Sequence, residues 1–306
     1  RWLAALKAQG CRDTTLAERS QKVERLAADM GSRPVSSMTR DDVASWLQSK
    51  GMTGATWDSY RRAYRAMFQF AAEERMVESN PVAAIKPMRT DEKLPTPFTV
   101  EAATAILRTA AQWTPEVVPT LAVQFFAGLR PGEALGLDWS AVDFKGKTIR
   151  VMPETSKVRR TRIVPMNPAL AAWLGPYRKA SGPIGIQSKA RLNSILFMKR
   201  IGPAYEQKGI PIAERKPDAR PRGLAAAAGV KWIQDGARKT FATMHFAQYG
   251  DAGKTAGILG HVGDAGILYK HYKGLATKAE ARRFFAIRPA SDGAAVVKAN
   301  FQRVTA

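Results

Sequence analysis

Apolar positions in the first quarter of the chain recur every three or four residues, which predicts short amphipathic helices. The sequence TLAE at residues 15–18 has the pattern of a capping box and predicts that one helix begins at Thr15. Thr39 predicts the start of a second helix that ends near Gly51, and Trp57 predicts the start of a third. We therefore expect an all-helical first unit, residues 1–85.

An aromatic stripe follows the third predicted helix. Its members are Trp57, Tyr60, Tyr64, Met67, Phe68 and Ala71. We interpret this stripe as the side of the helix that packs into a small core, in preference to a surface on which DNA bases stack. The arginines between its members, Arg61, Arg62 and Arg65, are expected to be available for phosphates.

The helical pattern ends at Asn80-Pro81. Residues 86–97 contain a charged stretch bracketed by prolines, which predicts a linker. A second unit, residues 98–289, begins with a predicted helix from Thr99 to about Ala111 and a buried helix from Pro119 to Ala127. We expect residues 290–306 to form a C-terminal tail.

Strand patterns occur in the middle of the second unit. Residues 142–144 and 148–151, on either side of Lys145-Gly146-Lys147, predict a β-hairpin, and residues 162–165 predict another strand. The expected fold class is therefore mainly α with a small antiparallel β-sheet. Residues 189–222 combine nine basic and three acidic residues with several prolines, which predicts a long irregular loop that either lies near DNA or is mobile.

Composition narrows the class of partner. The chain has 48 Lys and Arg against 26 Asp and Glu, with a net charge of +22 and a pI near 10.4. This balance favours a nucleic acid as partner and predicts strongly salt-dependent binding, with solvation of helix faces as the alternative explanation of the charge. The single cysteine excludes an intramolecular disulfide, and the three histidines lack the paired spacing of a zinc site, so we expect no metal and no cofactor.

The ends and the hydropathy of the chain bear on its location. No apolar run is long enough to span a membrane, and no signal peptide is present. We therefore expect a cytoplasmic protein without a membrane partner. The chain begins with Arg1 instead of Met, so we expect further residues upstream.

Three motifs far apart in the sequence supply side chains that suit phosphoryl transfer. They are GLRPGE at residues 128–133, ARKT at 237–240, and LGH at 259–261 followed by Tyr272. Fixed arginines can neutralise the charge that develops on a phosphate, and a tyrosine oxygen can then attack the phosphorus. The combination predicts phosphoryl transfer on DNA.

Local sequence predicts how these arginines are oriented. Pro131 suits the first position of a helix, so we expect Arg130 at a helix entrance, where an anion is favoured. Glu133 lies one turn later and is expected to orient Arg130 through an ion pair. Asp235 is expected to cap the helix that carries Arg238 in its first turn.

The order of these motifs resembles the tyrosine recombinases of the phage-integrase family. The resemblance rests on five elements: the first arginine box at 128–135, Ser156-Lys157 with residues 162–165, the second arginine box at 235–243, Leu259-Gly260-His261, and His271-Tyr272. The first unit also resembles the helical core-binding domain of that family. The resemblance implies a core-binding domain and an α+β catalytic domain that clamp duplex DNA. It also implies a 3'-phosphotyrosine intermediate, no metal or nucleotide cofactor, and self-association on DNA as a tetramer.

The resemblance also implies a role for each site residue. Tyr272 would attack the phosphorus, Arg130, Arg238 and His261 would stabilise the transition state, and Lys157 would protonate the leaving 5'-hydroxyl. The arginines at 159, 160 and 162 would lower the pKa of the Lys157 amine through like-charge repulsion, or Arg159 or Arg160 would contact phosphates instead. The C-terminal tail would either exchange between subunits, as in this family, or fold on its own domain.

Two positions depart from the family pattern. Asp235 stands where the family has a histidine, and it would either accept the tyrosine proton or serve only as a helix cap. The usual nucleophile position, nine residues after His261, is occupied by Lys270, which leaves Tyr269 and Tyr272 as candidates. We favour Tyr272 because it ends a His-Tyr pair, and we expect Tyr269 to pack against the core.

Three other classes of protein remain open at this stage. A non-catalytic DNA-binding or architectural protein would bind DNA without a covalent product, and a type IB topoisomerase-like enzyme would relax supercoiled DNA without a defined site. An RNA-binding module ranks last because the sequence has no Gly-rich aromatic motif. The recombinase interpretation predicts a protein encoded by a phage or another mobile element.

Overall fold

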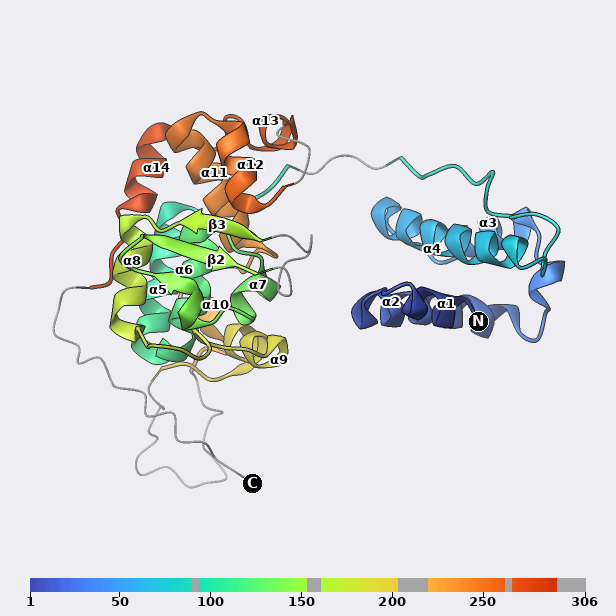
Figure 1. Ribbon diagram of the computed structural model, residues 1–306, viewed down its shortest axis with the longest axis horizontal. Helices are drawn as coiled ribbons and strands as arrows, with labels where there is room; N and C mark the ends of the chain where they lie inside the picture. The colour runs from blue at the N-terminus through green and yellow to red at the C-terminus, as the bar shows by residue number, and fades with distance from the viewer. Residues whose placement is uncertain (90–93, 153–160, 203–219, 262–265, 291–306) are drawn as a thin grey trace, which may run out of the picture. The chain divides into compact units, whose positions relative to one another are not determined.

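The computed structural model describes residues 1–89, 94–152, 161–202, 220–261 and 266–290 of the chain. The chain divides into two compact units, Arg1–Lys93 and Leu94–Ala306 (Figure 1). Each unit has its own cluster of buried apolar side chains.

The first unit is all-helical. It consists of α1 (Trp2–Ala8), α2 (Asp13–Met30), the 3₁₀ turn η1 (Val35–Ser37), α3 (Arg40–Ser49) and α4 (Gly54–Glu73). α4 packs against each of the other three α-helices. Trp46, Tyr60 and Tyr64 meet at ring-centroid distances of 5.5–6.0 Å in the middle of this packing, which gives a small unit a well-defined aromatic core.

The predicted helix starts in this unit have mixed outcomes. Thr39 does begin a helix, because its hydroxyl accepts the Asp42 N–H while the Asp42 carboxylate accepts the Thr39 N–H. The predicted capping box at Thr15 is wrong, because α2 already begins at Asp13, whose carboxylate suits the first turn. The third helix begins at Gly54 instead of Trp57, and α1 was not predicted.

The aromatic stripe of α4 faces the core, as predicted. Trp57, Tyr60, Tyr64 and Phe68 are all buried. The expectation for Arg61 is wrong: its side chain is also buried, where Nε donates to Asp58 at 2.7 Å and Nη1 donates to the Ile85 carbonyl at 3.2 Å. This arginine therefore ties α4 to the segment after it and is not available for a phosphate. Arg62 and Arg65 are exposed, so their contact with phosphates stays a prediction.

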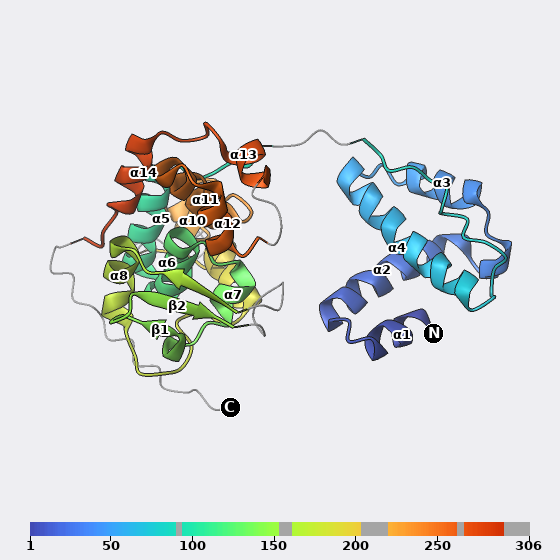
Figure 2. The same cartoon turned by 45° about the horizontal axis from the view of Figure 1, so that its top comes forward.

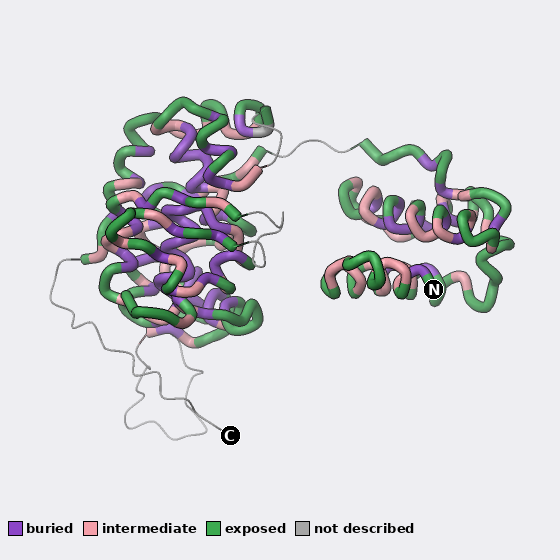
Figure 3. The backbone as a smooth tube through the Cα atoms, in the orientation of Figure 1, coloured by how far each residue is buried: buried purple, intermediate pink, exposed green. Residues whose placement is uncertain are grey.

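The second unit is built around one helix that is completely buried, α6 (Val118–Ala127). Its helices are α5 (Val100–Trp113), η2 (Pro115–Val117), α6 (Val118–Ala127), α7 (Pro131–Leu135), η3 (Trp139–Ala141), α8 (Pro168–Leu174), η4 (Gly175–Tyr177), α9 (Lys189–Asn193), the π-helical η5 (Ser194–Met198), α10 (Leu224–Ala227), α11 (Gly236–Tyr249), α12 (Ala252–Leu259), α13 (Gly266–Tyr272) and α14 (Lys278–Phe285). Every residue of α6 is buried, and α6 packs against α5, α8 and α11. Figure 3 shows this buried centre in purple.

Three short strands form one antiparallel sheet. Their order is β1 (Val142–Asp143), β2 (Thr148–Val151) and β3 (Arg162–Pro165), with Ile149 paired to Val142 and Val164. Ile149, Val151 and Val164 are buried whereas Arg150 and Ile163 are exposed, so only one face meets the core. β3 lies next to α12 (Figure 1), and Figure 2 shows the same sheet in a turned view, with β1 and β2 labelled. The predicted fold class, mainly α with a small antiparallel sheet, is confirmed.

The prediction of an irregular stretch at 189–222 is wrong at its start. Residues 189–198 form α9 and η5, because Leu192, Ile195 and Leu196 are buried in the core of the unit. Residues 203–219 lie outside the described residues. Across the part of the chain that the structure describes, no helix has the length and apolar content to cross a bilayer.

Candidate active site

Arg130 lies at the junction between α6 and α7. α6 ends at Gly128, which adopts a left-handed conformation with φ 64°. Two residues later Arg130 precedes α7 in an extended conformation, and Pro131 is the first helical residue, as predicted. Because α7 is only five residues long, we attribute the orientation of Arg130 mainly to its side-chain partners.

Glu133 is the first of those partners and is almost fully buried, with 1% of its side chain exposed. Its Oε2 accepts the Arg130 backbone N–H at 2.8 Å, and its Oε1 accepts Arg130 Nη1 at 3.1 Å. The predicted ion pair is therefore confirmed. A second cation was not predicted: Arg162 donates to Oε1 at 2.9 Å and to Oε2 at 2.6 Å.

The charge of Glu133 depends on these donors. Burial opposes ionisation, but hydrogen bonds from Arg162 and from the Arg130 backbone outweigh it and lower the pKa of the Glu133 carboxyl below its ordinary value. Glu133 is therefore a carboxylate at neutral pH.

Arg238 lies in the first turn of α11, as predicted. Its Nη1 donates to the Gly128 carbonyl, and its Nη2 donates to the Leu259 carbonyl at 2.7 Å. Burial, with the nearby charge of Arg130, lowers the pKa of Arg238 to about 9. An arginine in such surroundings is poorly solvated, so an entering anion would gain from its charge.

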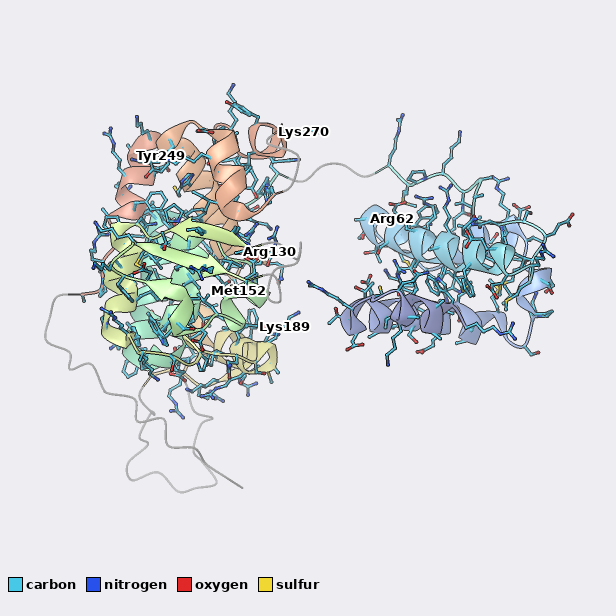
Figure 4. All side chains as sticks on the ribbon, viewed as in Figure 1. Arg62, Arg130, Met152, Lys189, Tyr249 and Lys270 are labelled. Carbon is cyan, nitrogen blue, oxygen red and sulfur yellow. The ribbon has the colours of Figure 1, made fainter. Side chains whose placement is uncertain are left out.

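The C-terminal end of α12 brings three arginines together. α12 ends at Gly260, which is left-handed with φ 66°. Three successive carbonyls at this end each accept one guanidinium: Ile258 from Arg162 at 2.9 Å, Leu259 from Arg238 at 2.7 Å, and Gly260 from Arg130 at 3.4 Å. The carbonyl end of a helix carries partial negative charge, which favours cations here. Side chains from β3, α11 and the start of α7 thus converge beside His261 (Figure 4 labels Arg130).

His261 is neutral in this environment. Burial and the charges of Arg238 and Arg130 lower the pKa of its imidazole to about 4. Its Nε2 lies 3.3 Å from Arg238 Nη2, and because a guanidinium can only donate, Nε2 is the acceptor and the proton is on Nδ1. Nδ1 is buried and has no hydrogen-bond partner among the described residues. This N–H is therefore a buried donor without an acceptor among the described residues.

Tyr272 is the last residue of α13 and is half-buried against the core. Burial raises the pKa of its hydroxyl, the charge of Arg238 opposes that rise, and the charge of Asp235 adds to it. Tyr272 is therefore close enough to the arginine cluster to be influenced by it, and a phenol in this state needs a proton acceptor before it attacks.

Tyr269 differs from its expected position. Its side chain is 51% exposed and contacts Phe246 edge-on at 5.2 Å between ring centroids. The expectation that Tyr269 packs against the core is met only in part, because one edge of its ring contacts the buried Phe246 and the rest of the side chain is in solvent. The choice of Tyr272 as nucleophile stays a prediction.

Asp235 does not cap α11 with its side chain, so that expectation is wrong. Its backbone is left-handed, with φ 53° and ψ 19°, and no cap hydrogen bond forms. An N-cap side chain needs an extended backbone to reach the first N–H groups of the helix, and the left-handed conformation turns it away. The carboxylate of Asp235 is exposed and is not used by the helix.

One predicted site residue cannot be placed. Lys157 lies outside the described residues, as do Arg159 and Arg160. Arg162, by contrast, was treated only as a neighbour of Lys157, and its role in the site was missed. The alternation of β3 was the available indication, because Arg162 lies two residues before the buried Val164 and therefore on the same face of the sheet.

Metal ligands do not gather in this region. Among the described residues, no group of three or more His, Cys, Asp or Glu side chains is arranged to hold a metal ion. The polar groups that do converge are three arginines, one carboxylate, one neutral imidazole and, nearby, one phenol.

Comparison with known proteins identifies relatives of the chain. A tyrosine recombinase XerC 1 from Ralstonia nicotianae is 28% identical over 236 residues, which cover 70% of this chain and 68% of the relative. A tyrosine recombinase XerD from Neisseria meningitidis is 24% identical over 246 residues, which cover 79% of this chain and 80% of the relative.

Solved structures share the fold. The Tn1549 transposon integrase in complex with a circular intermediate DNA has a TM-score of 0.60 at 18% identity, covering 92% of this chain and 96% of that one. A lambda integrase tetramer bound to a Holliday junction has a TM-score of 0.58 at 16% identity, covering 86% of this chain and 76% of that one. Residues 97–277, more than half of the chain, match the model of the phage integrase family. The chain belongs to this family of tyrosine recombinases.

Proposed function

We propose that this protein is a site-specific DNA recombinase that cleaves and rejoins strands through a 3'-phosphotyrosine at Tyr272. The observation that carries this proposal is the convergence of Arg130 and Arg238 on the end of α12 beside the free N–H of His261. The family supports it, as do relatives named as tyrosine recombinases and integrases solved on DNA.

The reaction is a displacement at phosphorus. The Tyr272 oxygen forms a bond to phosphorus as the bond to the 5'-oxygen breaks, so the energy of the phosphodiester is kept for rejoining. Arg130, Arg238 and the Nδ1–H of His261 stabilise the non-bridging oxygens in the transition state. Lys157 donates the proton that the 5'-oxygen takes up.

The tyrosine proton also needs an acceptor. We assign this role to Asp235, which occupies the position of the family histidine and whose charge reaches Tyr272. Its carboxylate is not committed to capping α11. The repulsion between this carboxylate and a phosphate would be offset by the nearby arginines.

The remaining parts of the chain have proposed roles in DNA binding and assembly. Residues 1–85 would be the core-binding domain, 86–97 the linker and 98–289 the catalytic domain, which together would bind duplex DNA. Self-association is supported by the lambda integrase tetramer, and we propose a tetramer on DNA, with residues 290–306 either exchanged between subunits or folded on their own domain. The protein would act in the cytoplasm on the DNA of a phage or another mobile element.

A nicked suicide substrate tests the proposal. Sequencing the DNA that flanks the gene provides candidate attachment-site repeats, and a nick next to the cleavage site lets the released 5'-end diffuse away. Wild-type protein in EDTA should form a covalent protein–DNA adduct on a denaturing gel, and Tyr269→Phe should form it too. Tyr272→Phe should form none.

Three results would contradict the proposal. An adduct formed by Tyr272→Phe would remove Tyr272 as the nucleophile. Specific binding with no adduct by the wild-type protein would favour the non-catalytic DNA-binding class. Relaxation of a supercoiled plasmid that lacks the repeats would favour the type IB topoisomerase-like class.

A further inference from the structure

Arg162 is a buried cation that connects three segments of the second unit. Only 10% of its side chain is exposed. Its two Nη atoms donate to the two oxygens of Glu133 on α7, and its Nε donates to the Ile258 carbonyl at the end of α12. All three guanidinium nitrogens thus have protein partners. This is the geometry of an arginine that holds protein segments together, and not of one that is free to bind a phosphate.

Arg130 depends on the carboxylate that Arg162 fixes. The contacts from Arg162 to Glu133, 2.9 and 2.6 Å, are shorter than the 3.1 Å contact from Arg130 Nη1. The other partner of the Arg130 guanidinium among the described residues, the Gly260 carbonyl, is 3.4 Å away. Without the two hydrogen bonds from Arg162, the Glu133 carboxylate would have no side-chain donor among the described residues except Arg130 itself.

Arg162 also lies directly against the turn that precedes His261. A Cβ atom built on Gly260 would lie 3.2 Å from both Cδ and Nη1 of Arg162. The left-handed φ of 66° favours glycine at position 260, and a larger residue there would also press against the side chain of Arg162. The same side chain thus touches the segments that carry Arg130 and His261.

We propose that Arg162 is a positioning residue for the DNA-cleavage reaction: it holds Glu133 and the end of α12 together, and so fixes Arg130 and His261 where the phosphate binds. It does not touch the DNA. This inference rests on the proposed function of the site, but its structural part can be measured without DNA.

The first experiment measures the motion of Arg130 in the free protein. In protein labelled with ¹⁵N-arginine, the Nε–H signal of Arg130 is assigned by its loss in Arg130→Lys, and its relaxation is then compared between variants. Wild type and Arg150→Met, which removes an exposed arginine from the neighbouring strand, should show a rigid Arg130. Arg162→Met should show a mobile one.

Arg162→Lys is the second variant, for the case that Arg162→Met does not fold. It keeps the positive charge but cannot make the paired hydrogen bonds to the two oxygens of Glu133. It should show intermediate mobility of Arg130. An Arg130 signal as rigid in folded Arg162 variants as in wild type would overturn the inference.

The second experiment separates positioning from a general loss of structure. With saturating suicide substrate, Arg162→Met should cleave about 100-fold more slowly than wild type, the size expected for a misplaced catalytic group, while its DNA affinity changes less than threefold. A methylphosphonate at the scissile position removes one phosphate charge and with it the need for a well-placed Arg130. The rate penalties of Arg162→Met and Arg130→Ala should therefore shrink together on this substrate.

The outcomes distinguish the two proposals. If wild type forms no adduct, the proposed function fails, and the relaxation of Arg130 alone decides the inference. If wild type forms the adduct and Arg162→Met keeps its full penalty on the methylphosphonate, Arg162 acts elsewhere and the inference fails.

Discussion

At the centre of the site, one buried carboxylate faces two guanidinium groups. Glu133 accepts two hydrogen bonds from Arg162 and two from Arg130, so each of its carboxylate oxygens accepts one bond from each arginine. Removing one partner from a buried ion pair leaves the others desolvated and unpaired. Stability and geometry at this site therefore depend on the same atoms.

Glu133→Gln should be strongly destabilising. Two largely buried guanidinium groups would lose their counter-charge, at a cost of about 3 kcal/mol in the free energy of unfolding. Glu101→Gln, which removes a carboxylate paired with Arg283 on the surface, is the matched control and should cost much less, because solvent screens an exposed ion pair. Urea unfolding of both variants makes the comparison, and equal losses would contradict the account.

Acid should remove the contribution of Glu133. The pKa of its carboxyl in the folded protein is lower than the ordinary 4.5, so its stabilisation is fully present above that pH and is lost as pH falls through the folded pKa. Glu133→Gln should therefore lose less stability in acid than wild type does.

The lowered pKa of His261 predicts that the stability of the protein also depends on pH in a range above that of Glu133. Its pKa in the folded protein is about 4 against an ordinary 6.5, so below pH 6.5 the unfolded chain takes up a proton that the folded protein does not. Stability should fall from pH 6.5 towards 4, and His261→Asn should fall less steeply than wild type. Identical slopes in urea unfolding at pH 7, 6 and 5 would show that His261 is not buried in the neutral form.

At the scale of elements, the arginines are positioned by the ends of helices. Gly128 is the C-cap of α6 and Gly260 is the C-cap of α12, both in the left-handed conformation, and the carbonyl oxygen of each accepts a hydrogen bond from an arginine of the candidate site. A Cβ atom on Gly128 would overlap the ring of Phe241 and the side chain of Leu259. These turns thus combine a backbone requirement with close packing of α6 against α11 and α12.

Gly128→Ala should therefore be destabilising by at least about 1 kcal/mol from the backbone alone, with a further loss from the overlap with Phe241. Gly257→Ala, inside α12 with nothing near its Cβ position, is the control and should stabilise the protein by about 0.5–1 kcal/mol. Thermal unfolding of the two variants should shift in opposite directions. A neutral Gly128→Ala would mean that α6 and α11 pack less closely than described.

Sequence predicted those elements whose patterns are local. The burial of α6, the Thr39 and Thr99 helix starts and the three strands all follow from short-range patterns that the structure reproduces. The order of the motifs also predicted that Arg130, Arg238 and His261 meet.

Other features could not be predicted because they depend on contacts across the fold. The conformation of Asp235 and the exposure of Tyr269 are decided by neighbours far away in the sequence. Arg162 occurs among three other basic residues between 157 and 162, so composition did not distinguish it, and only its pairing with Glu133 does. Helices α8 and α9 were not predicted, because both are short and begin next to residues that are typical of turns.

At the scale of the whole molecule, net charge dominates. A formal charge of +22 over 306 residues attracts a polyanion before any specific contact forms. Many of these cations are exposed, such as Arg62 and Arg65 on α4, whereas the arginines of the site are largely buried and have protein partners. We thus attribute DNA affinity to the exposed cations, and we propose that the arginines of the site act in strand cleavage.

DNA affinity should consequently fall steeply with salt. If six or more phosphates are neutralised, affinity should drop by about 1000-fold between 50 and 200 mM salt. Fluorescence anisotropy with a labelled duplex measures this slope. A change of less than tenfold would mean that most of the basic side chains do not reach the DNA.

The central claim is that the phenol of Tyr272 becomes bonded to the DNA, and mapping the attached peptide tests it most directly. Trypsin cleaves after Lys254, Lys270 and Lys273, so the two tyrosine candidates fall in separate peptides. After digestion of the trapped adduct with trypsin and nuclease, mass spectrometry should find the nucleotide on residues 271–273. A nucleotide on residues 255–270, which contain Tyr269, would contradict the account.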